Sequence, residues 1–170
     1  MSNILDTIPL GEEVEIRGPT GEIQYHGSST FTISSKIYHF PRINLILGGS
    51  GITPGFALLS HSLNTPNDTT QFRVIDANKT QNDILLHDEL DGLEKKSKGR
   101  LKVTHVLSHP EEGWEGRRGH VDAGVLREGL FGPGEGTGVF LCGPPGLIQK
   151  AVLPGLREWG FREDESVFGF

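Results

Sequence analysis

The chain has 170 residues, a formal net charge of −6 at pH 7 and 35% hydrophobic residues. This length allows one domain with a substantial core, and the acidic balance argues against non-specific binding of nucleic acid or of a membrane surface. The single cysteine excludes an internal disulfide. We find no basic signal-peptide start and no run of roughly 20 apolar residues that would span a bilayer, so we expect a cytoplasmic protein without a membrane partner.

The first forty residues are predicted to form short antiparallel strands. Residues 13–17, 22–26 and 30–33 alternate polar and apolar side chains, which is typical of strands with one solvated face. Two or three such strands are too few for a stable sheet on their own. These strands therefore need something else to pair with, and we divide the chain into residues 1–40 and a main unit, residues 41–170.

From Arg42 onward, predicted strands and helices alternate. This order is typical of a Rossmann-like α/β fold, a doubly wound parallel sheet of about five strands with helices on both faces. Ligands of such sheets bind beyond the carboxyl ends of the strands. The expected strands are residues 43–47, 72–75, 101–106, 139–142 and 166–168, and the expected helices are residues 54–63, 82–96, 121–128 and 145–159.

The first strand of this series runs into a glycine-rich turn, whose members are Gly48, Gly49, Ser50, Gly51, Ile52, Thr53 and Pro54. A backbone rich in glycine can approach a phosphate closely, and a helix N-terminus favours an anion. We expect Thr53 to be the N-cap and Pro54 the first helical residue. The spacing departs from the G-x-G-x-x-G fingerprint. The alternative is an ordinary strand-to-helix turn whose glycines only make it tight.

The fourth strand ends in a second turn of small and rigid residues, Cys142, Gly143, Pro144 and Pro145. Cys142 is either a small apolar core residue or a soft side chain that faces a ligand. No His and Asp partners lie near it in the sequence, so we do not interpret it as a covalent nucleophile. Asp76, at the end of the second strand, is either a cofactor contact or a turn residue. The seven histidines show no metal-ligand spacing, and we expect no metal site.

Several motifs resemble one family. The turn at residues 48–54 resembles the G-G-T/S-G-I-T-P loop of the cytochrome b5 reductase branch of the ferredoxin–NADP reductase superfamily. Residues 77–86 match its A-N-x-T-x-x-D-I-L-L segment, and residues 142–145 match its C-G-P-P motif. Residues 76–80 and 107–110, with the terminal Val-Phe-Gly-Phe, are most similar to the C-terminal part of fungal assimilatory nitrate reductases.

The resemblance implies an NAD(P)H-binding domain that docks the nicotinamide for hydride transfer to FAD. Electrons would then pass to a b-type haem domain and to a molybdopterin centre that reduces nitrate, in a homodimeric full enzyme. Cys142 would lie near the hydride path. The other implied cofactor-binding residues are Gly48, Gly49, Ser50, Gly51, Thr53, Pro54, Asn78, Lys79, Thr80, Gly143, Pro144, Pro145 and Phe170. Two alternatives stay open: a cytochrome b5 reductase-like diaphorase, and a nucleotide-binding module without a redox role.

The resemblance also indicates a missing part. The family binds FAD in a six-stranded antiparallel barrel through an R-x-Y-S/T motif, which this chain lacks. Met1 and Ser2 resemble the end of the family's G-G-x-M-S segment, so Ser2 would be a remnant flavin contact. We expect the chain to begin at the last strands of the FAD-binding barrel, as an excised fragment or a truncated gene product. Without its acceptor, the isolated chain should bind nucleotide and not oxidise it.

The choice between NADPH and NADH is expected to depend on the loop after the third strand. NADH-preferring relatives tend to carry an aspartate at the position of Ser108. Ser108 and His109 instead resemble the Ser-Arg pair that holds the 2′-phosphate in NADP-using relatives. Arg117 and Arg118 follow in the same loop as candidate cations. The alternative is that these arginines belong to a solvated, charged loop. We expect NADPH to be preferred.

Overall fold

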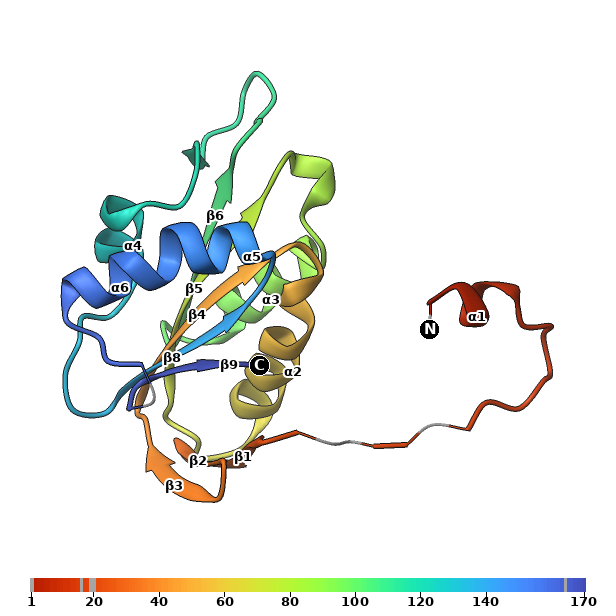
Figure 1. The fold of residues 1–170 in the computed structure, drawn as a ribbon, viewed down its shortest axis with the longest axis horizontal. Helices are drawn as coiled ribbons and strands as arrows, with labels where there is room; N and C mark the ends of the chain where they lie inside the picture. The colour runs from red at the N-terminus through yellow and green to blue at the C-terminus, as the bar shows by residue number, and fades with distance from the viewer. Residues whose placement is uncertain (1, 16, 19–20, 164) are drawn as a thin grey trace.

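The computed structural model describes residues 2–170 except 16, 19, 20 and 164. Its centre is a six-stranded parallel sheet in the order β7-β6-β5-β4-β8-β9, shown in Figure 1. The strands are β4 (Arg42–Gly48), β5 (Gln71–Asn78), β6 (Leu101–Leu107), β7 (Arg117–Arg118), β8 (Thr137–Cys142) and β9 (Val167–Gly169). The five expected strands are present. The sixth, β7, has two residues at the sheet edge, too few to show an alternating pattern.

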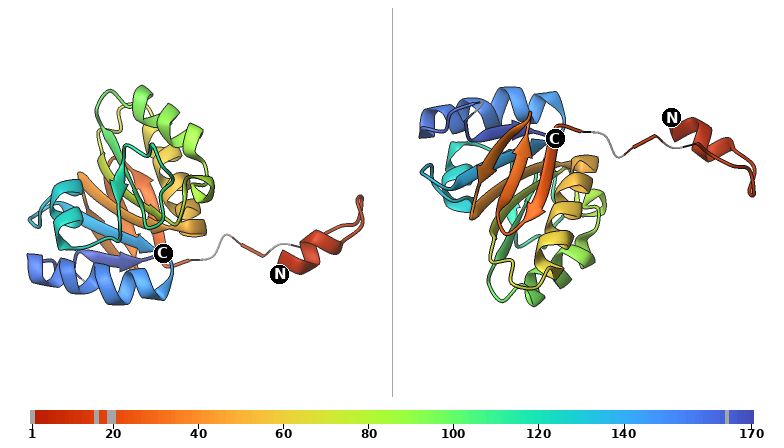
Figure 2. Two further views of the ribbon diagram at one scale, coloured as in Figure 1. Left: turned by 90° about the horizontal axis from the view of Figure 1, so that it is seen from above. Right: turned by 90° about the horizontal axis from the view of Figure 1, so that it is seen from below.

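Helices cover both faces of this sheet, as expected for a doubly wound fold (Figure 2). On β4, Leu45 and Leu47 pack into one buried cluster, which includes residues of α2 (Ile52–Asn64) and α3 (His87–Lys96). Ile46 packs into a second cluster with residues of α4 (Ala123–Gly129) and α6 (Leu153–Trp159). Because successive side chains of a strand point to opposite faces, one apolar run builds two cores. The fold class is confirmed.

Two expected helices differ from the observed ones. Residues 82–96 do not form one helix: a 3₁₀ turn, η2 (Gln81–Asp83), comes first, the backbone is left-handed at Leu86 with φ 56°, and α3 begins at His87. Asp83 accepts hydrogen bonds from the backbone and hydroxyl of Thr80, and this capping box closes the short turn. Residues 145–159 divide into α5 (Pro145–Leu147), a π-helical turn η3 (Ile148–Val152) and α6. Pro154 has no N–H to donate, which disfavours a regular α-helix there.

The N-terminal region also departs from the prediction. A helix, α1 (Ser2–Thr7), forms where none was expected, and residues 13–15 and 17 belong to no strand. Residues 13–15 are exposed, and an alternating segment without a partner strand gains no stability from pairing. The antiparallel sheet is β1 (Ile23–Gly27), β2 (Thr30–Ile33) and β3 (Lys36–His39), in that order. The third strand was not predicted.

The antiparallel sheet packs on the parallel sheet and shares its core. Phe31, Ile33 and Phe40 belong to the same buried cluster as β4 and β8 residues, and the right-hand view of Figure 2 shows the two sheets together. The Phe31 ring stacks on the Phe140 ring at 4.9 Å between centroids. The domain boundary at residue 40 stays a prediction, but a common core spans it.

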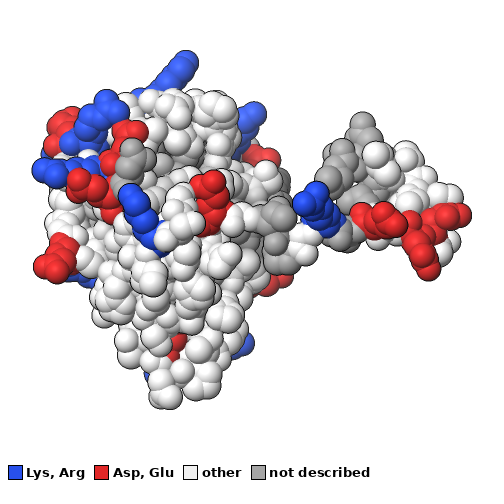
Figure 3. Space-filling view, turned by 60° about the horizontal axis from the view of Figure 1, so that its bottom comes forward, with Lys and Arg blue, Asp and Glu red and all other residues white. Residues whose placement is uncertain are grey.

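The surface carries charges of both signs. On the face in Figure 3, Lys and Arg lie among Asp and Glu near the edge, and a broad area between them is uncharged. Among the described residues, no helix is both long and apolar enough to cross a bilayer.

A hydrogen-bond network joins the antiparallel sheet to the segment just before β5. The Tyr25 hydroxyl on β1 donates to the Asp68 carboxylate at 2.5 Å and lies 3.0 Å from the Thr70 hydroxyl. Burial and the hydrogen bond to Asp68 raise the pKa of Tyr25. Burial acts to raise the pKa of Asp68 too, but the hydrogen bonds from Thr70 and Tyr25 outweigh it, so that the pKa is lowered. The ionised Asp68 therefore stabilises the folded state.

We expect Asp68→Asn to lower the free energy of unfolding at pH 7 by about 1–3 kcal/mol, because a buried hydrogen-bonded charge is lost. A carboxylate with a lowered pKa stabilises the fold above the unfolded value of about 3.9, and this contribution disappears as the pH falls through the folded-state value. Denaturant titrations from pH 7 to 3 should therefore show wild type and variant converging in acid. Glu112→Gln, at an exposed acid, is the control. A constant difference across this range would contradict the assignment.

Candidate active site at the carboxyl end of the sheet

The main cavity, of about 580 Å³, lies at the carboxyl ends of four parallel strands. The chain order reverses between β4 and β8, which is the switch point where ligands bind in such sheets. The cavity brings together predicted residues from four separate loops. These are Gly49 after β4, Asn78 and Lys79 at β5, Ser108 after β6, and Pro144 after β8.

The helix that follows the glycine-rich turn begins two residues earlier than predicted, at Ile52. Gly49–Gly51 forms a 3₁₀ turn (η1), and α2 begins at Ile52 with Gly51 as its N-cap. The N-cap role expected of Thr53 is therefore wrong, and its hydroxyl donates to the Ser50 carbonyl at 3.0 Å. Pro54 lies in the first turn of the helix but is not its first residue. A missing N–H costs nothing there, because the first four N–H groups have no partner within the helix.

Two of the turn's glycines are needed for packing between loops. A Cβ at Gly51 would lie 2.3 Å from the Cys142 carbonyl oxygen, and one at Gly48 would lie 2.8 Å from Leu147. A Cβ at Gly143 would lie 3.1 Å from the Gly48 nitrogen. Gly48 and Gly51 therefore both make the turn tight, and a role for them in cofactor binding stays a prediction. Gly49 differs, since it has φ +55° with open space around it, and it lines the cavity.

The ends of β5 and β6 supply the polar groups of the cavity. Asn78 donates through Nδ2 to the Asp76 carboxylate at 2.9 Å, whereas its Oδ1 is buried with no partner among the described residues. The Ser108 hydroxyl lies 2.9 Å from Nδ1 of His109. Hydrogen bonds from Thr80 lower the pKa of Asp83, and the charge of Lys79 adds to this effect. The cavity thus presents the Lys79 cation, the Asp83 carboxylate, which is already bonded to Thr80, and the Asn78 amide, whose buried Oδ1 has no partner among the described residues.

The two arginines expected beside Ser108 lie elsewhere. Arg117 forms an ion pair with Glu128, and Arg118 donates to the Trp114 carbonyl at 2.7 Å. Neither lines the main cavity, which instead receives His120 from the same loop. Sequence reasoning missed His120; its place two residues after Arg118, in the loop already singled out, is the signal that could have found it. Other predicted residues also lie outside the lining of the main cavity: Gly48, Ser50, Gly51, Thr53, Pro54, Thr80, His109 and Pro145. The side chain of Ser2 is outside the described residues.

Cys142 lines a second cavity of about 340 Å³ together with Gly143 and the C-terminal Phe170. Phe170 is 42% exposed, and its ring stacks on Phe140 at 5.5 Å between centroids. Its backbone N–H donates to the Leu141 carbonyl at 3.1 Å. Gly143 lines this cavity and Pro144 the main one, so the turn after β8 forms the wall between them.

The two cavities fit a long ligand with apolar rings and anionic groups. The main cavity contains apolar side chains from Val106, Val121 and Leu147 beside the Lys79 cation. The second offers an exposed aromatic ring beside a free thiol. A nicotinamide dinucleotide has this composition, with two flat ring systems joined by a pyrophosphate. Gly49, Asn78, Lys79 and Ser108 would hold its adenosine and phosphate parts, and the nicotinamide would supply a hydride.

This sheet, its glycine turn and its cavities define a pyridine-nucleotide-binding domain. Residues 45–152 match the family model described as "Oxidoreductase NAD-binding domain", and the chain belongs to this family. The chain is 38% identical over 171 residues to nitrate reductase (NADH) 1 of Arabidopsis thaliana and 39% identical over 175 residues to nitrate reductase (NAD(P)H) of Hordeum vulgare. These alignments cover 100% of this chain but only 19% and 20% of the relatives.

Solved structures agree with this assignment. The cytochrome b5 reductase domain of Ulva prolifera nitrate reductase matches with a TM-score of 0.95 and 34% identity, over 99% of this chain and 64% of that one. The CS-b5R domains of human Ncb5or match with a TM-score of 0.68 and 28% identity, over 77% of this chain and 37% of that one. The expected resemblance to the reductase part of nitrate reductases is confirmed.

We expect Gly51→Ala to destabilise the fold by about 1–3 kcal/mol or more, because its Cβ would overlap the Cys142 carbonyl. The backbone of Gly51, with φ −62° and ψ −10°, suits alanine, so the loss of stability would come from the clash alone. Gly92→Ala on α3 is the matched control, since a Cβ there meets nothing within 4 Å and alanine favours a helix. Thermal unfolding that ranks Gly51→Ala equal to Gly92→Ala would contradict this packing argument.

Proposed function

We propose that the chain is the NAD(P)H-binding part of the reductase unit of an assimilatory nitrate reductase. It would dock the nicotinamide for hydride transfer to FAD, held by a neighbouring barrel domain. One observation carries the proposal. Residues from four separate motifs meet around one cavity at the switch point, in a chain similar over its whole length to nitrate reductases.

We assign the two cavities to the two ends of the dinucleotide. The main cavity would take the adenosine and phosphates, with Lys79 near the negative charge and the Asn78 Oδ1 accepting a hydrogen bond. The second cavity would take the nicotinamide, between Cys142 and Phe170. Hydride transfer requires donor and acceptor in near-attack contact. The chain's contribution is to orient one ring and to exclude water around it.

The remaining partners follow from the length of the relatives. The chain spans about a fifth of the two plant nitrate reductases, which leaves room for an FAD barrel, a haem domain and a molybdenum domain. The three-stranded sheet ends in β1 on one side and β3 on the other, and Ile37 on β3 is 79% exposed. These edges suit continuation into a larger barrel. Homodimerisation of the full enzyme stays a prediction.

A diaphorase is the second candidate. The similarity to the CS-b5R domains of human Ncb5or favours it, because such a unit would need FAD but no molybdenum centre of its own. The presence or absence of molybdenum and haem domains in the same polypeptide distinguishes the two.

We expect NADPH to bind more tightly than NADH, since Ser108 lines the cavity without adding a negative charge. Ser108→Asp should weaken the binding of NADPH about five-fold or more and leave the binding of NADH unchanged. The reason is that a negative charge beside the 2′-phosphate costs about 1 kcal/mol even in water. Calorimetric titration of both nucleotides measures this. Gln24→Glu, which adds the same charge at an exposed position of β1, is the control. Equal or tighter binding of NADH to the wild type would refute the Ser108 argument.

Cys142→Ser should leave nucleotide affinity within about two-fold and slow flavin reduction once the chain is joined to its FAD barrel, because the thiol lines the smaller cavity. Stopped-flow absorbance of the flavin, with calorimetry for binding, separates the two effects. The flavin-free chain should show no NADPH:ferricyanide turnover, as it holds no hydride acceptor. Turnover by this chain, or a large loss of affinity in the variant, would contradict the proposal.

A further inference from the structure

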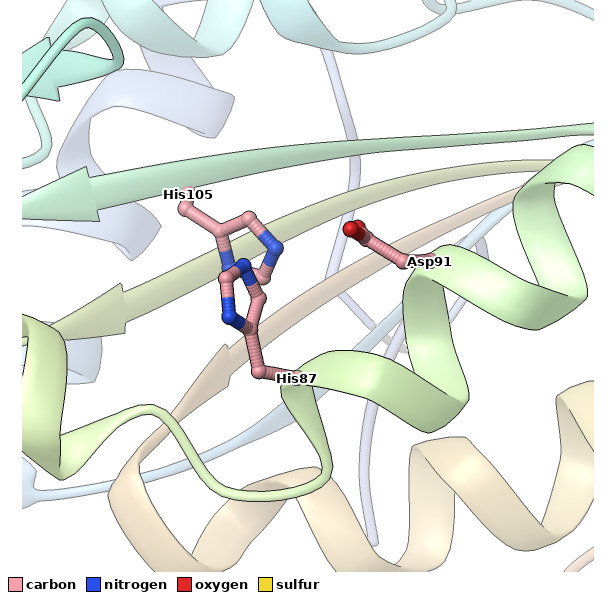
Figure 4. A group of neighbouring side chains, drawn as sticks. All are labelled: His87, Asp91 and His105. Atoms are coloured by element: carbon pink, nitrogen blue, oxygen red, sulfur yellow. The ribbon is translucent and has the colours of Figure 1, made fainter.

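We propose that His87, Asp91 and His105 form a binding site for a divalent transition-metal ion, with Zn²⁺ as the representative ion. Each residue offers one ligand atom, and these atoms all lie within 4.8 Å of one another. The three side chains point toward one another from helix α3 and strand β6 (Figure 4). None of them lines the main cavity, so this site is separate from the nucleotide site and does not depend on the proposed function.

Secondary structure positions all three ligands. His87 and Asp91 are four residues apart on α3, which places them on the same face of the helix one turn apart. His105 lies on β6, against which α3 packs. The two imidazole rings meet edge to face, with 4.9 Å between centroids and an interplanar angle of 86°. The site therefore joins a helix to a strand at a contact that the fold already makes.

A buried carboxylate orients His105 for metal binding. Nδ1 of His105 lies 3.0 Å from the Asp76 carboxylate, whose side chain is 1% exposed. The carboxylate can only accept, so Nδ1 carries the proton and the lone pair of the neutral ring is on Nε2. Nε2 is buried and has no hydrogen-bond partner among the described residues. Metal-binding histidines commonly donate their other nitrogen to a carboxylate in this way, and an unpartnered buried nitrogen is costly unless something binds it.

The donor set suits zinc in chemistry and in size. Two imidazole nitrogens and one carboxylate oxygen are ordinary Zn²⁺ ligands, with bonds of about 2.0–2.2 Å. Tetrahedral donors are then about 3.3 Å apart, so the ligands must close by at most about 1.5 Å from the 4.8 Å limit observed. All three residues are partly exposed, which permits small side-chain rotations and entry of the ion. Water would complete the coordination.

This proposal departs from the expectation of no metal site. That expectation considered only the spacing of the histidines along the sequence. The partners of His105 are instead on the preceding helix, and the pairing of β5 with β6 places Asp76 directly opposite His105. Asp76 on β5 and the two ligands on α3, His87 and Asp91, therefore come close to His105 only in the folded chain.

The test is calorimetric titration of the metal-free, untagged chain with Zn²⁺. We expect one ion per chain with a dissociation constant of roughly 1 µM, and a visible absorption spectrum typical of low coordination number when Co²⁺ is used instead. His87→Gln and Asp91→Asn should each weaken Zn²⁺ binding at least ten-fold. Asp76→Asn, which keeps every ligand, should weaken it about 10–100-fold.

Two matched controls should bind as the wild type does: Asp88→Asn, at an exposed acid on the same helix, and His109→Gln, at an exposed histidine beyond the same strand. Circular dichroism verifies that each variant is folded. His87→Gln and Asp91→Asn are safer than Asp76→Asn, because His87 and Asp91 are partly exposed and Asp76 is buried. Absence of stoichiometric binding by the wild type, or binding by folded His87→Gln equal to that of the controls, would overturn the proposal.

Discussion

The close contact between two glycine-containing turns, at the centre of the parallel sheet, determines the shape of the active site. Leu47 of β4 pairs with Cys142 of β8, so the turns that follow these strands emerge side by side. They can touch only because Gly51 has no side chain against the Cys142 carbonyl. This contact leaves Gly49 and Pro144 on the main cavity and Cys142 on the smaller one. A dinucleotide that occupies both would cross this wall, with its hydride-bearing ring near the C-terminus.

The buried carboxylate of Asp76 holds two residues of different sites. Its Oδ2 accepts hydrogen bonds from Asn78, which lines the main cavity, and from His105, which belongs to the proposed metal site. A buried carboxylate is tolerated when it is hydrogen-bonded. The sequence left Asp76 either as a cofactor contact or as a turn residue. In the structure Asp76 does not line the cavity; it holds Asn78, which does, and His105.

The three-stranded sheet depends on the parallel sheet for its core. Phe31 packs on Phe140, and Tyr25 bonds to Asp68 and Thr70, so apolar burial and a buried network both cross the boundary at residue 40. This explains how so few antiparallel strands remain ordered. The same contacts would hold a neighbouring barrel in a defined position against the nucleotide site.

The sequence alone determined the fold class, the five main strands and four of the loops that meet at the cavity, because apolar runs and glycine or proline turns are local signals. It did not predict where α2 and α3 begin, since α2 directly follows a 3₁₀ turn that ends at Gly51, and the left-handed backbone of Leu86 delays the start of α3 to His87. Only the tertiary structure directed Arg117 and Arg118 away from the cavity and brought His120 to it. It alone joined His87 and Asp91 to His105, because a strand and a helix separated in sequence meet only after the sheet has formed.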